Sequence, residues 1–129
     1  MKHLRWLLPV CLAVVPFAFG AEDPSPEHVK LMKELGALSG KIRKGEDVEE
    51  SAKRMSALGQ SAMGFYAKKG DVATTALKNM VTASNMIASA AANKDTAVLA
   101  DASKMLGSTC KSCHDQYREK VSDGVYKIK

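Results

Sequence analysis

Aromatic residues are scarce in this chain, at 5% of its 129 residues, and it has only four prolines and three cysteines. It also has no internal repeat, no low-complexity tract and no sign of a second domain. Alanine, methionine and lysine are plentiful instead, which favours helices over sheet. Because one hydrophobic core serves a chain of this length, we expect a single small all-α domain.

A large excess of one charge is lacking as well. The formal net charge is +5, and it falls to +3 without Lys2 and Arg5, each of which contributes one positive charge in a predicted leader. So small an excess gives little support to nucleic-acid binding.

Residues 1–20 have the three parts of a secretory signal peptide. A basic start is followed by an apolar run over 6–19, with the small residues Ala18 and Gly20 before the expected cut. The run is short for a membrane span and two prolines interrupt it, so we expect no stable membrane anchor. We predict cleavage after Gly20 and a mature chain, 21–129, that is exported to the periplasm.

Two of the three cysteines stand close together in Cys110-Lys111-Ser112-Cys113-His114. The third, Cys11, falls in the leader, where the bulky Val10 before it argues against lipid attachment, so no pair remains for a structural disulfide. On a helix the two thiols share one face and the histidine lies one turn beyond Cys110. This C-x-x-C-H pattern suits covalent haem, with the thiols joined to its vinyl groups and the His114 imidazole as an axial iron ligand.

Other chemistries of a C-x-x-C have less support. A redox dithiol would accompany a βαβ pattern, which the sequence lacks. A zinc site needs further ligands, but outside the motif and the leader the chain has a single histidine, His28, and no cysteine. A haem-free metal site built from the motif and Met32 is a weaker alternative.

Apolar residues at helical spacing predict four helices. The first begins at Ser25-Pro26 and ends at Lys44-Gly45, because a capping serine, a first-turn proline and a glycine are typical of helix ends. The other three are expected over 47–68, over 71–93 with Asp71 as the cap, and from Asp95 or Thr96 through the C-x-x-C-H. Short connections force antiparallel neighbours, which predicts an up-down-up-down four-helix bundle.

Met32 lies early in the first predicted helix, and the small residues Gly36 and Ser39 follow on its side. They would leave a slot for a flat macrocycle beside the helix. First and last helices are neighbours in such a bundle, so Met32 and His114 lie at the same end and can approach iron from opposite faces. His28, one turn before Met32, is a second candidate for the sixth ligand, and an iron without a sixth ligand is the third possibility.

The chain resembles the class II c-type cytochromes, the family of cytochrome c′ and its low-spin, methionine-ligated relatives. The segments that carry the resemblance are 110–118, 30–33 and 44–47. The resemblance implies one haem c on Cys110 and Cys113, with His114 as the proximal ligand. It further implies Met32 as the sixth ligand and Arg118 beside the haem.

The chain departs from that family in two places. Many relatives have an arginine where this chain has His28. The middle helices are also shorter than usual, which would leave the haem edge less covered.

Ligation by both His114 and Met32 leaves no open position on iron, so the sequence predicts a one-electron carrier rather than an enzyme, with the soft thioether raising the potential. The alternative is a five-coordinate protein that binds nitric oxide or carbon monoxide at an open distal site.

Expected partners are redox proteins and the haem-attachment machinery, and the alanine-rich helix faces leave open whether the protein forms a homodimer. Basic residues near the haem helix could steer an acidic partner, although cations at a helix end also favour its dipole and keep a surface soluble. They are Lys104, Lys111, Arg118, Lys120, Lys127 and Lys129.

Overall fold

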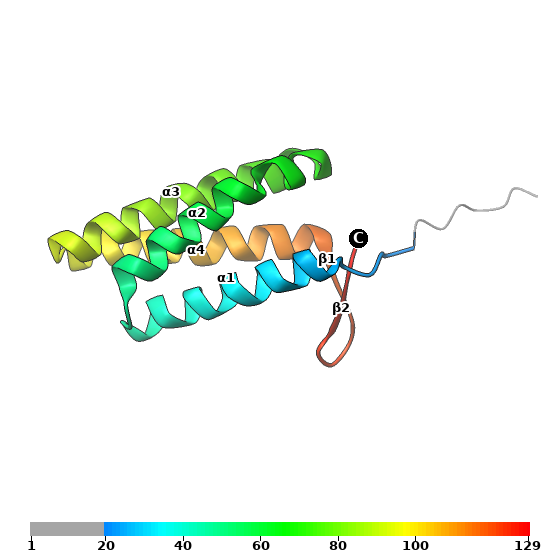
Figure 1. The fold of residues 1–129 in the computed structure, drawn as a ribbon, viewed down its shortest axis with the longest axis horizontal. Coiled ribbons are helices and arrows are strands. Elements are labelled where there is room, and N and C mark those ends of the chain that lie inside the picture. The colour runs from blue at the N-terminus through cyan, green and yellow to red at the C-terminus, as the bar shows by residue number, and fades with distance from the viewer. Residues whose placement is uncertain (1–19) are drawn as a thin grey trace, which may run out of the picture.

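The computed structural model describes residues 20–129, which form four α-helices and a short β-hairpin (Figure 1). The helices are α1 (Pro26–Lys44), α2 (Val48–Tyr66), α3 (Asp71–Asn93) and α4 (Thr96–Tyr117), with a 3-10 turn, η1 (Ala67–Lys69), after α2. The hairpin consists of β1 (Arg118–Ser122) and β2 (Val125–Ile128). Successive helices are antiparallel, with α1 packed on α2, α2 on α3 and α3 on α4. The predicted antiparallel four-helix bundle is confirmed.

The predicted signal peptide lies outside the described residues apart from Gly20, and so does Cys11. Within 20–129, no helix is long and apolar enough to cross a membrane.

Both ends of α1 and the start of α4 form as the sequence predicts. The Ser25 hydroxyl accepts a hydrogen bond from the backbone N–H of His28 at 3.2 Å. At the other end Gly45 has a φ of 75°, and its N–H donates to carbonyls of the last turn. The Asp95 carboxylate caps α4 by accepting from the N–H of Val98 at 3.0 Å.

The starts of α2 and α3 differ from the prediction. The second helix begins at Val48, after Asp47 in the left-handed conformation (φ 46°), and Asp47 makes no side-chain capping bond. Asp71 is the first residue of α3 rather than its cap, and Gly70 precedes it. An acidic side chain in the first turn still suits the positive end of the helix dipole. At its far end α2 stops at Tyr66, because the chain tightens there into η1.

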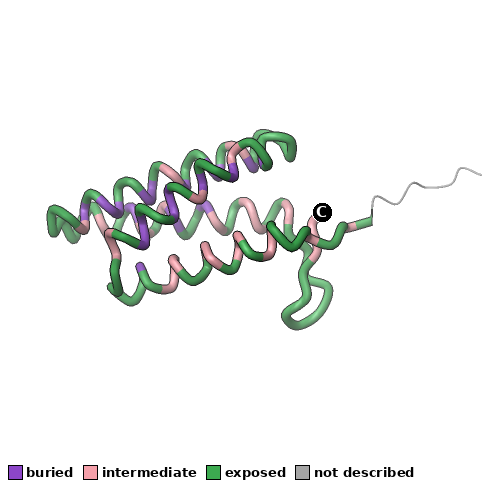
Figure 2. Tube along the Cα trace, in the orientation of Figure 1, coloured by how far each residue is buried: buried purple, intermediate pink, exposed green. Residues whose placement is uncertain are grey.

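The buried core lies mainly between α2, α3 and α4 (Figure 2). Residues of α3 such as Met80 and Ile87 are almost fully buried. In contrast, α1 contributes a single fully buried residue, Ile42, near its C-terminal end. Its other apolar residues pack against the core but stay half-buried; they are Leu31, Met32, Leu35 and Leu38. This half-buried set, the α1 stripe, makes α1 the least covered helix of the bundle.

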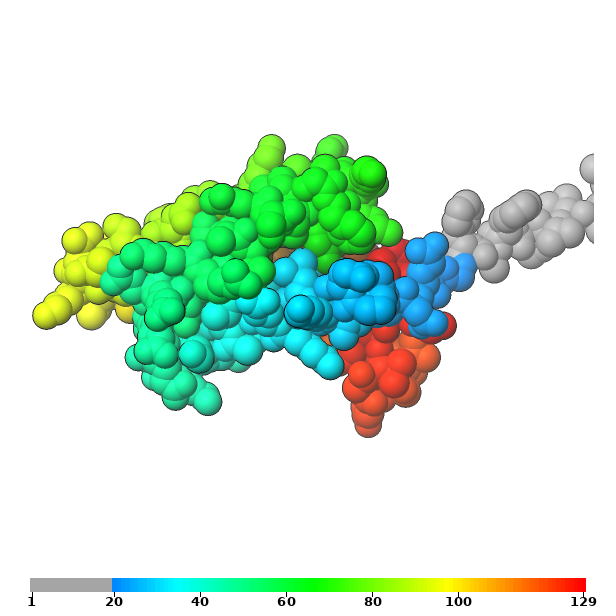
Figure 3. Space-filling model, in the orientation of Figure 1, coloured from blue at the N-terminus to red at the C-terminus, as the bar shows by residue number. Residues whose placement is uncertain are grey.

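The last residues of the chain add a hairpin to the predicted bundle. Its strands pair antiparallel, with Arg118 opposite Ile128, and they turn at Gly124, whose φ is 76°. At the other edge of β2, the backbone N–H and C=O of Glu22 each bond to Ile128 at 2.8 Å. Figure 3 shows the hairpin projecting from the end of the bundle, next to the start of α1. Both ends of the described chain are therefore joined at the end of the bundle where α1 begins and α4 stops.

We predict that Gly59→Ala destabilises the bundle, because α2 and α3 are in close contact at Gly59. A Cβ there would lie 2.7 Å from Met80 Cε and 2.9 Å from Val81 Cγ2. The free energy of unfolding should fall by about 1 kcal/mol, since overpacking costs about 1–3 kcal/mol and the gain in helix propensity is about 1 kcal/mol. Urea unfolding of the mature protein, followed by circular dichroism, measures the change.

The matched control is Gly64→Ala on the same helix, because no atom lies within 4 Å of the Cβ that it would add. This substitution should stabilise the protein by up to about 1 kcal/mol. Equal effects of the two substitutions would contradict the close contact at Gly59.

Candidate haem site

The C-x-x-C-H lies in the last two turns of α4, as predicted. Cys110, Cys113 and His114 are half-buried, and both thiols are free. Spacings of three and four residues put the three side chains on one face of the helix. Because α4 ends at Tyr117, this face lies at the end of the bundle where α1 begins (Figure 1).

The α1 stripe at the same end has no close helix partner on the side of α4. Among residues 20–129, α1 packs closely on α2, but its backbone hardly approaches that of α4. A Cβ added at Gly36 would meet no atom within 4 Å, and the same holds at Gly40. Gly36 is exposed, so this space is open to solvent, and a slot for a flat macrocycle beside it stays a prediction.

The two helices together present the donor set of a haem c. Two thiols and an imidazole stand on α4, and the thioether of Met32 stands on α1 within the apolar α1 stripe. Imidazole nitrogen and thioether sulfur are axial ligands that haem iron takes in c-type cytochromes. This chemistry and the space beside Gly36 fit a haem held by α4 and α1.

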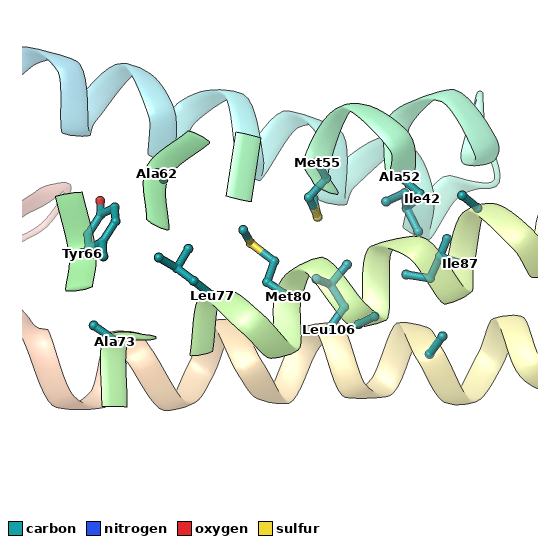
Figure 4. Close-up of a cluster of buried hydrophobic side chains, with 13 residues drawn as sticks. Ile42, Ala52, Met55, Ala62, Tyr66, Ala73, Leu77, Met80, Ile87 and Leu106 are labelled. Atoms are coloured by element: carbon teal, nitrogen blue, oxygen red, sulfur yellow. The ribbon is translucent and has the colours of Figure 1, made fainter. Parts of the chain in front are cut away.

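The structure adds Tyr66, the last residue of α2, to this end of the bundle. Helical spacing predicts that either Phe65 or Tyr66 takes a core position, and Tyr66 is the one that is buried. Its hydroxyl also forms a hydrogen bond with Nδ1 of His28, in the first turn of α1. The two ring centroids lie 5.7 Å apart, and Phe65 packs edge-on against Tyr66 at 4.9 Å (Figure 4 shows Tyr66). The second candidate for the sixth ligand, His28, is therefore held against α2 through its Nδ1.

Burial favours the neutral form of both imidazoles at this end. It lowers the pKa of His114, and the charge of Arg118 lowers it further while that of Asp115 raises it. Burial also lowers the pKa of His28, with smaller contributions from the charges of His114 and Lys69. A neutral imidazole is the form that binds a metal.

The thiols and the tyrosine are shifted by burial as well. It raises the pKa of both Cys110 and Cys113. It also raises the pKa of Tyr66 to about 12, and the charge of Cys113 adds to this shift. The charge of Cys113 thus reaches Tyr66, and that of His114 reaches His28.

Arg118 follows α4 directly, in extended conformation at the start of β1. Its N–H donates to the carbonyl of His114, and its guanidinium carbon lies 3.3 Å from the centroid of the Tyr126 ring on β2. This cation–π contact accounts for the position of an otherwise exposed side chain. The prediction that Arg118 also lies beside the haem stays a prediction.

The last turn of α4 is held from two sides. The Tyr117 hydroxyl donates to the carbonyl of Lys69 in η1 at 3.0 Å. From the other side Lys129 donates its backbone N–H to the Tyr117 carbonyl at 2.9 Å and its Nζ to the Asp115 carbonyl at 3.1 Å. These bonds satisfy carbonyls that a helix end leaves without partners. The C-terminal residues thereby fix the turn that carries His114.

Most of the predicted basic patch is paired with carboxylates. Four of its six cations lie within ion-pair distance of an acidic side chain, and the pairs are Lys104–Asp101, Lys111–Asp115, Lys120–Asp123 and Lys127–Asp23. Six cations beside four carboxylates leave two uncompensated charges. The local field that could steer an acidic partner is therefore weaker than the sequence suggests.

The haem-free metal site that the sequence left as an alternative needs further ligands around the motif. In the part of the chain that the structure describes, no group of three or more histidine, cysteine, aspartate or glutamate side chains is placed to hold a metal ion.

The family model of cytochrome c′ matches residues 65–118. The match runs from the end of α2 through α3 and α4, so it includes Tyr66 and the whole C-x-x-C-H but not α1. Searches among curated proteins and among solved structures gave no match. A C-x-x-C-H is the attachment motif of c-type haem. The family match, the four-helix bundle and the motif in its last helix together support the resemblance to the class II c-type cytochromes.

Proposed function

We propose that this cytochrome is a periplasmic one-electron carrier whose haem iron is ligated by His114 and Met32. The observation that carries the proposal is the position of Met32. It lies in the half-buried α1 stripe, beside open space at Gly36, on the helix that lacks close packing with α4. The predicted signal peptide supports export to the periplasm.

Each protein group has a separate part in this proposal. One haem c, attached to Cys110 and Cys113, would supply the one-electron couple. His114 is ready to bind in the neutral form, because burial lowers its pKa. Met32 offers a soft, uncharged sulfur that neither gains nor loses a proton. With a protein ligand on each side there is no open position for a substrate, so we propose a carrier rather than an enzyme.

The α1 stripe would keep water away from the distal ligand. Leu31 and Leu35, one turn apart on either side of Met32 in the sequence, pack against the core. A dry, apolar environment destabilises the ferric state more than the ferrous state, because ferric iron has one more positive charge. It therefore raises the reduction potential in the same direction as the thioether does.

The first prediction concerns attachment. We expect the mature protein to have the mass of residues 21–129 plus one haem, and to keep a haem stain through denaturing electrophoresis. Replacing Cys110 and Cys113 together by serine should abolish the stain, because serine forms no thioether. Lys111→Gln, between the two cysteines, is the matched control and should keep it. A wild-type mass without haem would contradict covalent attachment.

The second prediction concerns the sixth ligand. Met32→Leu keeps the side-chain volume but removes the sulfur. The wild-type ferric protein should be low-spin, with the methionine-to-iron charge-transfer band in the near infrared. The variant should lose the band. Its ferrous form should also bind carbon monoxide at least about tenfold faster, because the Met32–iron bond, worth more than about 1.4 kcal/mol, no longer closes the site.

A half-buried methionine on α2, Met63, provides the control for this substitution. Met63→Leu should keep both the band and slow carbon monoxide binding. A spectrum and a binding rate that Met32→Leu leaves unchanged would contradict ligation by Met32.

One observation favours a second function. The matching family model is that of cytochrome c′, and the match does not reach α1, which carries Met32. With no sixth ligand, the iron would be five-coordinate and open to nitric oxide or carbon monoxide. The wild-type ferric protein would then be high-spin, and carbon monoxide would bind equally fast with and without Met32.

A further inference from the structure

The first half of α1 is held by few polar contacts. Its buried anchor, Ile42, lies near the opposite end of the helix. Around Met32, the described part of the chain has two side-chain hydrogen-bonded contacts between α1 and α2. One joins Arg54 and Glu34 at 2.8 Å, and the other joins Tyr66 and His28. Met32 lies between these two contacts along α1.

The two contacts differ in how far water reaches them. The side chains of Arg54 and Glu34 are 56% and 34% exposed, so their ion pair contributes little. Tyr66 is only 7% exposed and His28 is half-buried, so their hydrogen bond is shielded from competing water. In Figure 4 the hydroxyl oxygen of Tyr66 lies on the side of its ring that faces α1. The Tyr66–His28 bond is therefore the stronger polar link between the two helices.

This link also lies close to the haem motif. The charge of Cys113 adds to the raised pKa of Tyr66, and that of His114 adds to the lowered pKa of His28. A bond between α1 and α2 is thus within electrostatic reach of both the attachment site and the proximal ligand on α4. The Tyr66–His28 bond is therefore in a position to fix the first turns of α1 relative to the α4 face that carries the C-x-x-C-H.

We propose that Tyr66 and His28 are positioning residues that hold the first turns of α1 on α2 and thereby keep Met32 in place as the distal iron ligand. Met32 is one turn beyond His28 on the same side of the helix, so a displacement of the first turn displaces Met32 as well. The inference rests on the proposed function, because it concerns the ligand named there. It gives His28 a role other than ligation, and because the bond to Tyr66 uses Nδ1 and leaves Nε2 free, the His28 variants below are needed to separate the two roles.

Tyr66→Phe tests the proposal, because it removes the hydroxyl and keeps the ring against Phe65. Tyr117→Phe is the matched control, since it removes a hydroxyl that bonds to Lys69 at the same end of the bundle but on α4. Two quantities are measured on the haem-loaded mature protein: the rate of carbon monoxide binding to the ferrous form, and hydrogen exchange of the amides of residues 29–33. Tyr66→Phe should raise both about fivefold, the effect of one lost hydrogen bond, and weaken the near-infrared methionine band. Tyr117→Phe, which loosens the α4 side instead, should leave hydrogen exchange of residues 29–33 unchanged.

Two substitutions at His28 test the same hydrogen bond from the other side, one that keeps an acceptor for the Tyr66 hydroxyl and one that removes it. The Oδ1 of an asparagine lies near the position of a histidine Nδ1 and accepts a hydrogen bond from the tyrosine hydroxyl. We expect His28→Asn to keep wild-type rates and His28→Leu to behave like Tyr66→Phe. Because asparagine does not replace imidazole on iron, a normal spectrum of His28→Asn also separates positioning from ligation by His28.

The outcomes distinguish this proposal from the proposed function. Wild-type rates in Tyr66→Phe, with Met32→Leu still opening the iron, would overturn the positioning role alone. Rapid carbon monoxide binding by the wild type, unchanged in Met32→Leu, would overturn both proposals. Equal acceleration of hydrogen exchange at residues 29–33 by Tyr66→Phe and Tyr117→Phe would overturn the positioning role, because general loosening of the bundle end would then explain both.

Discussion

The structure depends on an apolar face of α1 that its neighbouring helices leave half-covered. The other three helices bury a common core, whereas α1 joins it with one fully buried residue, Ile42, far from the haem motif. Apolar surface left in water costs about 25 cal/mol per Å². A group that covers Leu31, Met32 and Leu35 therefore stabilises the fold at the same time as it gains a ligand. Under the proposed function, haem binding and the packing of α1 therefore contribute to the stability of the fold together.

The two helices that face the haem position are held differently. The end of α4 is fixed by Tyr117 on η1, by Lys129 on its last carbonyls and by the hairpin that pairs with Glu22. The first half of α1 is held mainly by half-buried apolar contacts and by the Tyr66–His28 bond. The end of α4 is thus held by more hydrogen bonds than the first half of α1. Under the proposed function, a small change in how α1 is held would open the iron.

Much of the bundle could be predicted because the helix ends and the motif carry local signals. Ser25, Gly45 and the break at 93–95 mark three ends, and the motif's spacing fixes its shared face. The hairpin has no long apolar run and is mostly exposed, so the apolar pattern does not predict it, although Asp123-Gly124 is a turn signal typical of two-residue hairpins. The Tyr66–His28 bond joins residues 38 positions apart, so it depends on how α1 lies on α2. Sequence spacing alone does not predict such a contact.

X-ray absorption at the iron edge of the haem-loaded ferric protein tests ligation by α1 most directly, because it identifies the atoms bound to iron without relying on substitutions. We expect six neighbours, of which one is the sulfur of Met32 and the rest are the nitrogens of the macrocycle and His114. The cysteine sulfurs bond to the macrocycle and not to iron, so they do not mimic this signal. A shell of five nitrogens, or of six nitrogens without sulfur, would contradict the account.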